Sequence, residues 1–181
     1  MKPIIQELLL SAGIVLLLSA PSFAFRDEPD NFRGIRWGTS IRDQSDMVLS
    51  EMRGSNTKYY LRNRDNMKMG QAEIAKISYL FYKDQFCGVT IIAEGYGSYE
   101  SLKKLMVQAY GGEYQLDSVR GTYRWQGKAV PVLISLAYDK TRKKGVASYS
   151  YEPIGKEVSR EEISKLLFMY LLMDSKCARG K

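Results

Sequence analysis

The strongest structural signal in the chain is the stretch Glu73-Ile74-Ala75-Lys76-Ile77-Ser78-Tyr79-Leu80-Phe81-Tyr82. Its alternate residues place one set of apolar side chains on a single face: Ala75, Ile77, Tyr79 and Phe81. After the polar turn Lys83-Asp84-Gln85, a second run alternates in the same way, with Cys87, Val89, Ile91 and Ala93 on one face. Period-two alternation on both sides of a short polar turn predicts a β-hairpin.

A helix is predicted directly after this hairpin, from Ser98 to about Tyr110. Four apolar residues recur there at helical spacing, namely Leu102, Leu105, Met106 and Ala109. More strands are expected around residues 123–125, 130–138 and 147–151, and a final helix begins at a capping box of Ser159 and Glu162. The apolar stripe of that helix consists of Ile163, Leu166, Leu167, Tyr170 and Leu171.

On the other side of the hairpin, the pattern predicts a short strand over residues 32–38, a short helix over 41–51 and a strand over 58–62. Hairpin followed by helix therefore occurs twice, at 73–110 and 122–174. This order predicts an α+β fold, with an antiparallel sheet built from two hairpin-plus-helix units and helices packed on one face.

The chain begins with the features of an export signal. Lys2 gives a small positive start, and an uncharged apolar run of thirteen residues extends from Leu8 to Ala20. Such a run is too short to span a bilayer of about 30 Å as a helix. Ser22 and Ala24 flank Phe23 at the spacing that a signal peptidase needs. The sequence therefore predicts an exported, periplasmic or secreted protein with no transmembrane segment after cleavage.

The sequence predicts that the chain is divided into four parts. We expect residues 1–24 to be a signal peptide and residues 25–33 to be an extended lead-in. Residues 34–177 then form a single α+β domain, and residues 178–181 a tail. A domain of this length is large enough to bury its own core.

Composition removes the commonest catalytic chemistries. The chain contains no histidine, which excludes Ser-His-Asp and Cys-His triads and every metal site that needs imidazole. Two cysteines cannot complete a four-thiolate zinc site. No cofactor and no metal ion are expected, and catalysis, if present, would have to use carboxylates.

Glu94 is the best single candidate for a general acid, because it lies at a strand end beside two glycines. Glycoside hydrolysis needs a second carboxylate at a suitable separation, and the sequence does not rank the other acids. A solvated charge at a strand end is the simpler interpretation.

Cys87 and Cys177 are the only thiols, and an even number in an exported chain permits a disulfide. Alternation places Cys87 on the same face as Val89 and Ile91, and Cys177 continues the stripe of the final helix from Ile163. The disulfide is therefore predicted, with two unlinked thiols as the alternative.

The motif Phe32-Arg33-Gly34-Ile35-Arg36-Trp37-Gly38-Thr39-Ser40 resembles the opening of a family of uncharacterised bacterial secreted proteins, which begin with F-x-G-I-x-W-G-T after a signal peptide. The resemblance extends over most of residues 32–111 and implies no activity. From the residues themselves, we expect Trp37 to close one end of the core and Gly38 to allow a sharp turn after the strand.

The net charge of +7 is scattered along the chain rather than gathered in a basic stripe with interleaved aromatic residues, so no nucleic-acid partner is expected. The missing catalytic signatures and the thirteen tyrosines favour a non-catalytic envelope protein that binds another envelope protein or a small ligand. Two alternatives stay open: a carboxylate-dependent hydrolase acting on an envelope glycan, and a peripheral module on the membrane surface.

Overall fold

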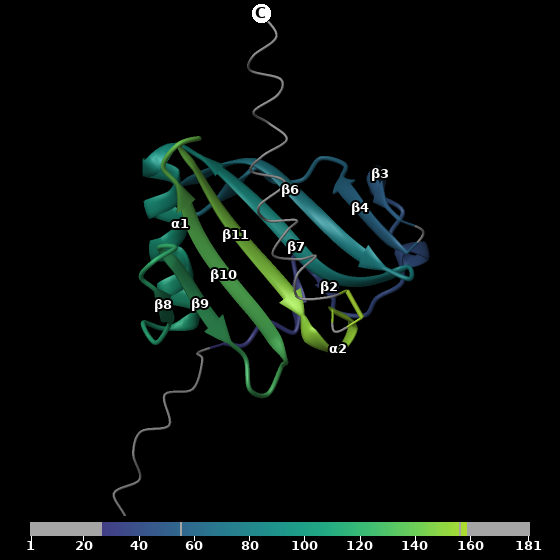
Figure 1. Ribbon diagram of the computed structural model, residues 1–181. Coiled ribbons are helices and arrows are strands. Elements are labelled where there is room, and N and C mark those ends of the chain that lie inside the picture. The colour runs from purple at the N-terminus through teal and green to yellow at the C-terminus, as the bar shows by residue number, and fades with distance from the viewer. Residues whose placement is uncertain (1–26, 55, 156, 159–181) are drawn as a thin grey trace, which may run out of the picture.

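A computed structural model describes residues 27–158, with the exception of 55 and 156. Its main feature is a nine-stranded antiparallel sheet in the order β3-β4-β6-β7-β11-β10-β9-β8, with β5 beside β6 (Figure 1). The strands of this sheet are β3 (Met47–Arg53), β4 (Thr57–Arg62), β5 (Lys68–Met69), β6 (Ala72–Tyr82), β7 (Gln85–Glu94), β8 (Gln115–Asp117), β9 (Thr122–Gln126), β10 (Val132–Asp139) and β11 (Lys144–Tyr151).

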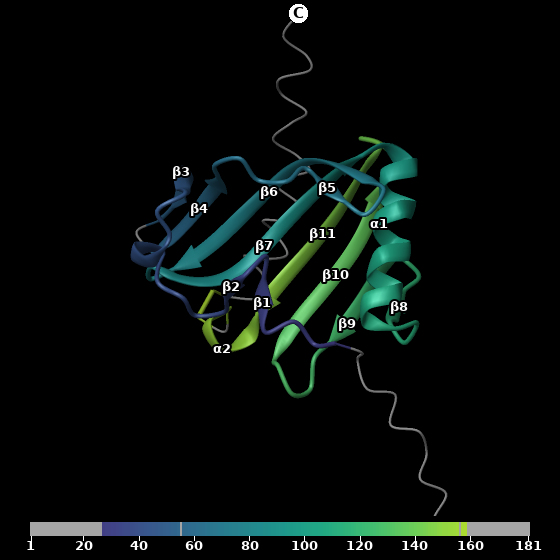
Figure 2. The same ribbon diagram turned by 180° about the vertical axis from the view of Figure 1, so that it is seen from behind.

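Few helices accompany this sheet. Two short strands, β1 (Asn31–Phe32) and β2 (Ile35–Arg36), form a separate hairpin. The described helices are α1 (Gly95–Tyr110), α2 (Glu152–Gly155) and the single 3₁₀ turn η1 (Ile41–Asp43). α1 and the β1–β2 hairpin lie on the same face of the sheet, which Figure 2 shows from behind.

The predicted α+β class is wrong. Strands contain 50% of the residues that the structure describes and helices only 18%, so the fold is a β-rich one with a large single sheet. One physical reason is the segment 41–51, which was expected to be a helix. Ser40 does cap a helical turn, but η1 ends at Asp43, and Met47–Arg53 continues as β3. The predicted final helix, 159–174, lies outside the described residues.

The main core lies between the sheet and α1. Tyr79, Val89, Tyr149 and Ile134 lie side by side across four neighbouring strands, and all are buried. From α1, the predicted residues Leu102 and Met106 are buried against this face, together with Tyr99. The apolar periodicity of this helix was therefore predicted correctly, although the helix begins at Gly95 rather than at Ser98.

The central hairpin of β6 and β7 was also predicted correctly, but two irregularities change which residues face the core. The register shifts between Ile74 and Lys76, so Ile74 joins the core and Ala75 is exposed. A second shift lies opposite Leu80 and Phe81, and it places Cys87 in a separate small cluster with Leu80 and Tyr59. The expectation that Cys87 shares the core face of Val89 and Ile91 is therefore wrong.

Gly145 allows α1 to pack closely on β11. A Cβ atom at this position would lie 2.9 Å from the Cβ of Tyr99. We expect Gly145→Ala to lower the free energy of unfolding by about 1–3 kcal/mol, because the helix must shift to relieve the overlap. Gly97→Ala is the matched control, since a Cβ there meets nothing within 4 Å. Equal melting temperatures for the two variants would contradict this account of the packing.

Candidate functional site

The most distinctive surface of the described chain is the edge strand β3. Among the described residues, β3 pairs on one side only, with β4. Its side chains include three exposed large apolar residues: Val48 is 50% exposed, Leu49 46% and Met52 54%. Exposed apolar side chains on an unpaired edge make a strand prone to pair with another chain.

The register of β3 places apolar side chains on both of its faces. Val48 is opposite Leu61 and Leu49 is opposite Tyr60, so these two neighbours point to opposite sides of the sheet. A bulge between Leu49 and Glu51 then alters the alternation. An incoming strand would therefore find apolar contacts above and below its backbone.

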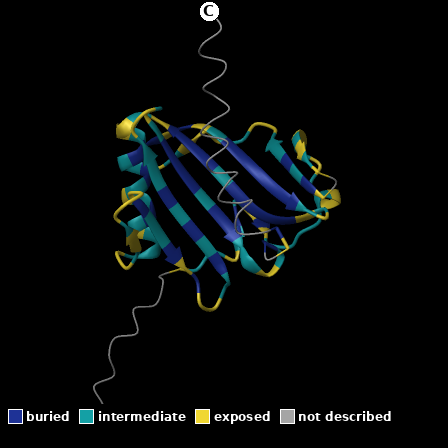
Figure 3. Ribbon diagram, in the orientation of Figure 1, coloured by how far each residue is buried: buried dark blue, intermediate teal, exposed yellow. Residues whose placement is uncertain are grey.

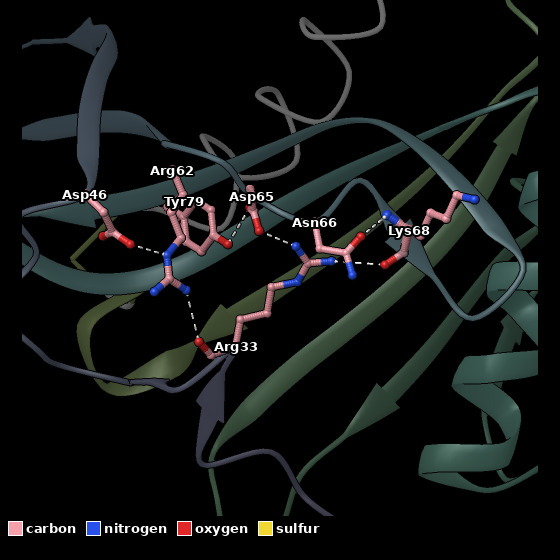
Figure 4. Close-up of polar contacts among 7 residues, drawn as sticks. All are labelled: Arg33, Asp46, Arg62, Asp65, Asn66, Lys68 and Tyr79. Carbon is pink, nitrogen blue, oxygen red and sulfur yellow. Dashed lines mark hydrogen bonds and ion pairs between the residues drawn. The ribbon is translucent and has the colours of Figure 1, made fainter.

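A polar network holds one end of this edge against the rest of the fold (Figure 4). Arg62, the last residue of β4, donates a hydrogen bond of 2.5 Å from Nε to Asp46 Oδ2 and one of 3.1 Å from Nη1 to the carbonyl oxygen of Arg33. Asp65 accepts hydrogen bonds from the Arg33 guanidinium and, at 2.7 Å, from Tyr79 Oη. The network thus joins the start of β3, the end of β4, the β1–β2 turn and β6.

The electrostatics of this network keep it intact around neutral pH. Burial and the hydrogen bond to Asp65 both raise the pKa of Tyr79, so its hydroxyl retains its proton. The hydrogen bond to Asp46 raises the pKa of Arg62 further above its usual value. Tyr79 and Arg62 therefore both keep their protons at neutral pH and remain hydrogen-bond donors in the network.

The opposite end of the edge carries exposed or half-buried ion pairs. Lys58 Nζ lies 2.8 Å from Asp84 Oδ1, and Arg53 Nε lies 2.7 Å from Glu51 Oε1. The hydrogen bond from Lys58 lowers the pKa of Asp84. The Arg53 guanidinium also covers the ring of Tyr59, with Cζ 5.3 Å from the ring centroid. Arg53 thus contacts β4 at this end of β3, while the side chains of Val48, Leu49 and Met52 are exposed between the two ends.

Glu94, the candidate general acid, ends β7 at the surface. Its side chain is 54% exposed, and Oε1 lies 3.3 Å from Lys144 Nζ. The ion-pair partner is therefore a cation and not the second carboxylate that glycoside hydrolysis requires.

Cys87 is buried, and its Sγ lies 3.6 Å from the carbonyl oxygen of Leu80. Cys177 lies outside the described residues, so the predicted disulfide stays a prediction. Burial raises the pKa of the Cys87 thiol to about 12. A thiol with this environment is a poor nucleophile at neutral pH.

A pH dependence follows from this burial. The folded chain keeps the Cys87 proton in a range, from about pH 9 to 12, where the unfolded chain loses it. The contribution of the Cys87 thiol to the free energy of unfolding is therefore fully present below about pH 9 and is lost as the pH rises towards 12. Urea denaturation measures the free energy of unfolding at about pH 8 and about pH 10. Between these two pH values, that free energy should fall further for the native sequence than for Cys87→Ala. Parallel losses in the two proteins would disprove this role of the thiol.

The motif residues of the N-terminal region have structural positions. Gly34 has φ +83° in the turn between β1 and β2, and Gly38 has the same φ just after β2. Trp37 stacks on Phe86 with ring centroids 4.8 Å apart, and its Nε1 donates a 2.7 Å hydrogen bond to the carbonyl oxygen of Pro29. These residues close one end of the core rather than line a pocket.

Other kinds of site have no support in the part of the chain that the structure describes. No group of three or more Cys, Asp or Glu side chains there could hold a metal ion. None of the described helices combines the length and the apolar composition that crossing a bilayer requires. The edge strand β3 and the polar network at its start are therefore the features from which a function can be argued.

Within the residues that the structure describes, these features define an antiparallel β-sheet with an apolar edge strand that pairs on one side only. Comparison with protein-family models, curated proteins and solved structures finds no match for this chain. The function must therefore be argued from its own residues.

Neither part of this site, the edge strand β3 or the polar network, was predicted from the sequence. Met47-Val48-Leu49 lies in the stretch interpreted as a helix, although this apolar run is also compatible with a strand. The network residues Arg33, Asp65 and Tyr79 are far apart in the chain, and Asp65 lies in a segment that reads as a polar loop. No local pattern connects them.

Proposed function

We propose that this chain is an exported envelope protein that acts without catalysis, as a module that binds another protein along β3. The bound segment is extended and adds a strand to the sheet at this edge. Main-chain hydrogen bonds supply affinity in this mode of recognition, and side-chain contacts supply specificity. The resemblance of residues 32–40 to a family of secreted proteins and the signal-like residues 1–24 support the location.

The observation that carries the proposal is the length and composition of the β3 edge. β3 has seven residues, whereas β8, at the other edge, has only three. A three-residue strand offers few main-chain partners. β3 therefore offers the longer template, together with the exposed side chains of Val48, Leu49 and Met52.

The charge of the chain favours a particular kind of partner. A net charge of +7 makes a second copy of this chain a poor partner, because like charges repel. An extended segment that alternates apolar and acidic residues would match both the exposed apolar side chains and the positive field. We therefore assign the β3 edge to a different protein rather than to self-association.

Site-specific photo-crosslinking in cells tests this assignment. A photoreactive amino acid at Met52 should yield a discrete crosslinked product with a second protein. The same amino acid at Val119, which is 94% exposed, should yield none, and it controls for apolar exposure alone. Equal products from both positions, or none from Met52, would refute binding at β3.

A charge substitution gives the complementary result. Leu49→Lys on the Met52 crosslinking background should abolish the product, since a lysine on an edge strand disfavours pairing with another strand. Val119→Lys adds the same charge at a distant exposed position and should leave the product unchanged. Both variants should melt like the unmodified protein, because neither position is buried.

The two alternative functions gain no specific support. Glu94 pairs with Lys144 at the surface. The final helix on which the membrane-surface alternative depends lies outside the described residues. Turnover of an envelope glycan that Glu94→Gln abolishes would favour the hydrolase over the binding module.

A further inference from the structure

The turn between β9 and β10, residues 127–131, holds a carboxylate. Glu28, which precedes Lys128 by 100 positions, accepts a 2.7 Å hydrogen bond at Oε1 from the main-chain N–H of Lys128. Its Oε2 accepts a second one from the main-chain N–H of Val130. Figure 2 shows the segment before β1 passing beside this turn. Each oxygen of the Glu28 carboxylate is thus held by a different main-chain donor.

The turn stabilises the charged form of this carboxylate. Burial raises the pKa of Glu28, but the main-chain hydrogen bonds from Lys128, Val130 and Ala129 outweigh that effect, so its pKa lies below the usual value. The ammonium group of Lys128 acts in the same direction. Successive main-chain N–H groups that converge on one point form a nest, which is a concavity that binds anions.

Contacts within the sheet and with α2 fix the shape of this nest. The main-chain N–H of Gly127 donates a 2.9 Å hydrogen bond to the carbonyl oxygen of Val132, and the N–H of Val132 donates one of 2.7 Å to the carbonyl oxygen of Val130. Pro131 has a fixed φ, and its carbonyl oxygen accepts a 2.9 Å hydrogen bond from the N–H of Glu152. The donors are therefore preorganised, and a ligand does not have to order them.

Gly127 is required for this shape. A Cβ atom at this position would lie 2.0 Å from the carbonyl oxygen of Val130 and 3.3 Å from Oε2 of Glu28. A side chain there would therefore open the turn and crowd the bound carboxylate. Lys128 and Ala129 are exposed, and Figure 3 shows the tip of this turn exposed at the end of the sheet. The turn is thus accessible from solvent.

We propose that the turn 127–131 is a binding site for the carboxylate of a ligand, and that Glu28 is its intramolecular occupant. Two donors hold the two oxygens of one planar group, which suits a carboxylate better than a monatomic anion. The terminal carboxylate of a peptide and the side chain of an acidic residue both offer this group. Glu28 competes from within the chain at a high effective concentration, so an external carboxylate binds when Glu28 leaves.

This site is separate from the proposed strand addition. β3 is one edge of the sheet, whereas β9 and β10 lie towards the other edge (Figure 1). A carboxylate bound at residues 127–131 therefore does not depend on a strand bound at β3.

NMR titration of the full chain with sodium acetate, at pH 7 and constant ionic strength, tests the site. In Glu28→Ala, which removes the occupant, the amide resonances of Lys128 and Val130 should shift saturably. Half-saturation should need at least about tenfold less acetate than in the native sequence, where Glu28 competes. Glu73→Ala removes an exposed carboxylate from β6 and should behave like the native sequence. Acetamide, which has a similar shape and no charge, should leave these resonances unchanged.

A change in the turn itself gives a second test. Gly127→Ala in the Glu28→Ala background should abolish the acetate-dependent shifts, because the added Cβ opens the turn. The amide resonances of β10 show whether the hairpin stays folded in this variant. If the hairpin is lost, the titration of Glu28→Ala alone decides between binding and its absence.

Other outcomes would overturn the assignment. Shifts in Glu28→Ala that do not saturate, or equal half-saturation in the native, Glu28→Ala and Glu73→Ala proteins, would mean that Glu28 only anchors its own segment. Tighter binding of phosphate than of acetate at equal ionic strength would assign the nest to phosphoryl groups instead of carboxylates.

Discussion

Replacing Asp65 with alanine is expected to lower the free energy of unfolding by about 3 kcal/mol. The Asp65 side chain is 7% exposed and accepts hydrogen bonds from Arg33 and Tyr79. Its removal leaves a guanidinium and a buried phenol without their common acceptor, and an unpaired buried polar group costs more than the lost bond alone. Urea denaturation measures the loss, and amide exchange in β3 and β4 should accelerate because the network holds that end of the hairpin.

Two variants separate this effect from a general loss of charge. Asp65→Asn keeps the shape and one acceptor oxygen, so it should retain part of the stability. Lys83→Ala removes a solvent-exposed ion pair with Glu157 and should hardly change the melting temperature. A loss below about 1 kcal/mol for Asp65→Ala would show that the network does not anchor the edge.

Replacing Trp37 with alanine should be about as damaging, with a loss of roughly 3 kcal/mol. The indole stacks on Phe86 and lies parallel to Tyr151, with ring centroids 6.1 Å apart in the second pair. Its Nε1 also donates to the carbonyl oxygen of Pro29. The alanine variant therefore loses packing at the end of the core and leaves one carbonyl oxygen without its donor.

Trp37→Phe divides the effect between packing and hydrogen bonding. The phenyl ring keeps much of the stacking, so we expect a loss of about 1 kcal/mol from the missing hydrogen bond. Thermal denaturation of the three proteins should give an intermediate melting temperature for phenylalanine. If alanine and phenylalanine prove equally stable, Trp37 does not close the core and the motif has another role.

The parts of the fold that could be predicted from the sequence are those with local periodicity. The alternation in residues 73–94 predicts β6 and β7, and the spacing of Leu102 and Met106 predicts α1. In these elements, a residue's environment depends on neighbours two to four positions away. The local pattern therefore predicts the element without knowledge of the rest of the chain.

The remaining features depend on contacts between distant residues. The bulge at Cys87 moves this side chain to another cluster, and only the register with β6 determines its position. The start of β3 was missed because Ser40 signals a helix start that η1 satisfies within one turn. The polar network of the candidate site joins Arg33 to Asp65, which lie 32 positions apart in the chain. No local sequence pattern predicts such a pair.

Amide hydrogen exchange of the complex captured through Met52 tests the binding edge most directly. If a partner segment adds a strand, the main-chain amides of β3 (Met47–Arg53) gain protection in the complex relative to the free protein, because new hydrogen bonds form along the edge. The amides of β8, at the opposite edge, should exchange as before. Unchanged exchange in β3, with protection elsewhere on the surface, would contradict the assignment of β3 as the site of strand addition.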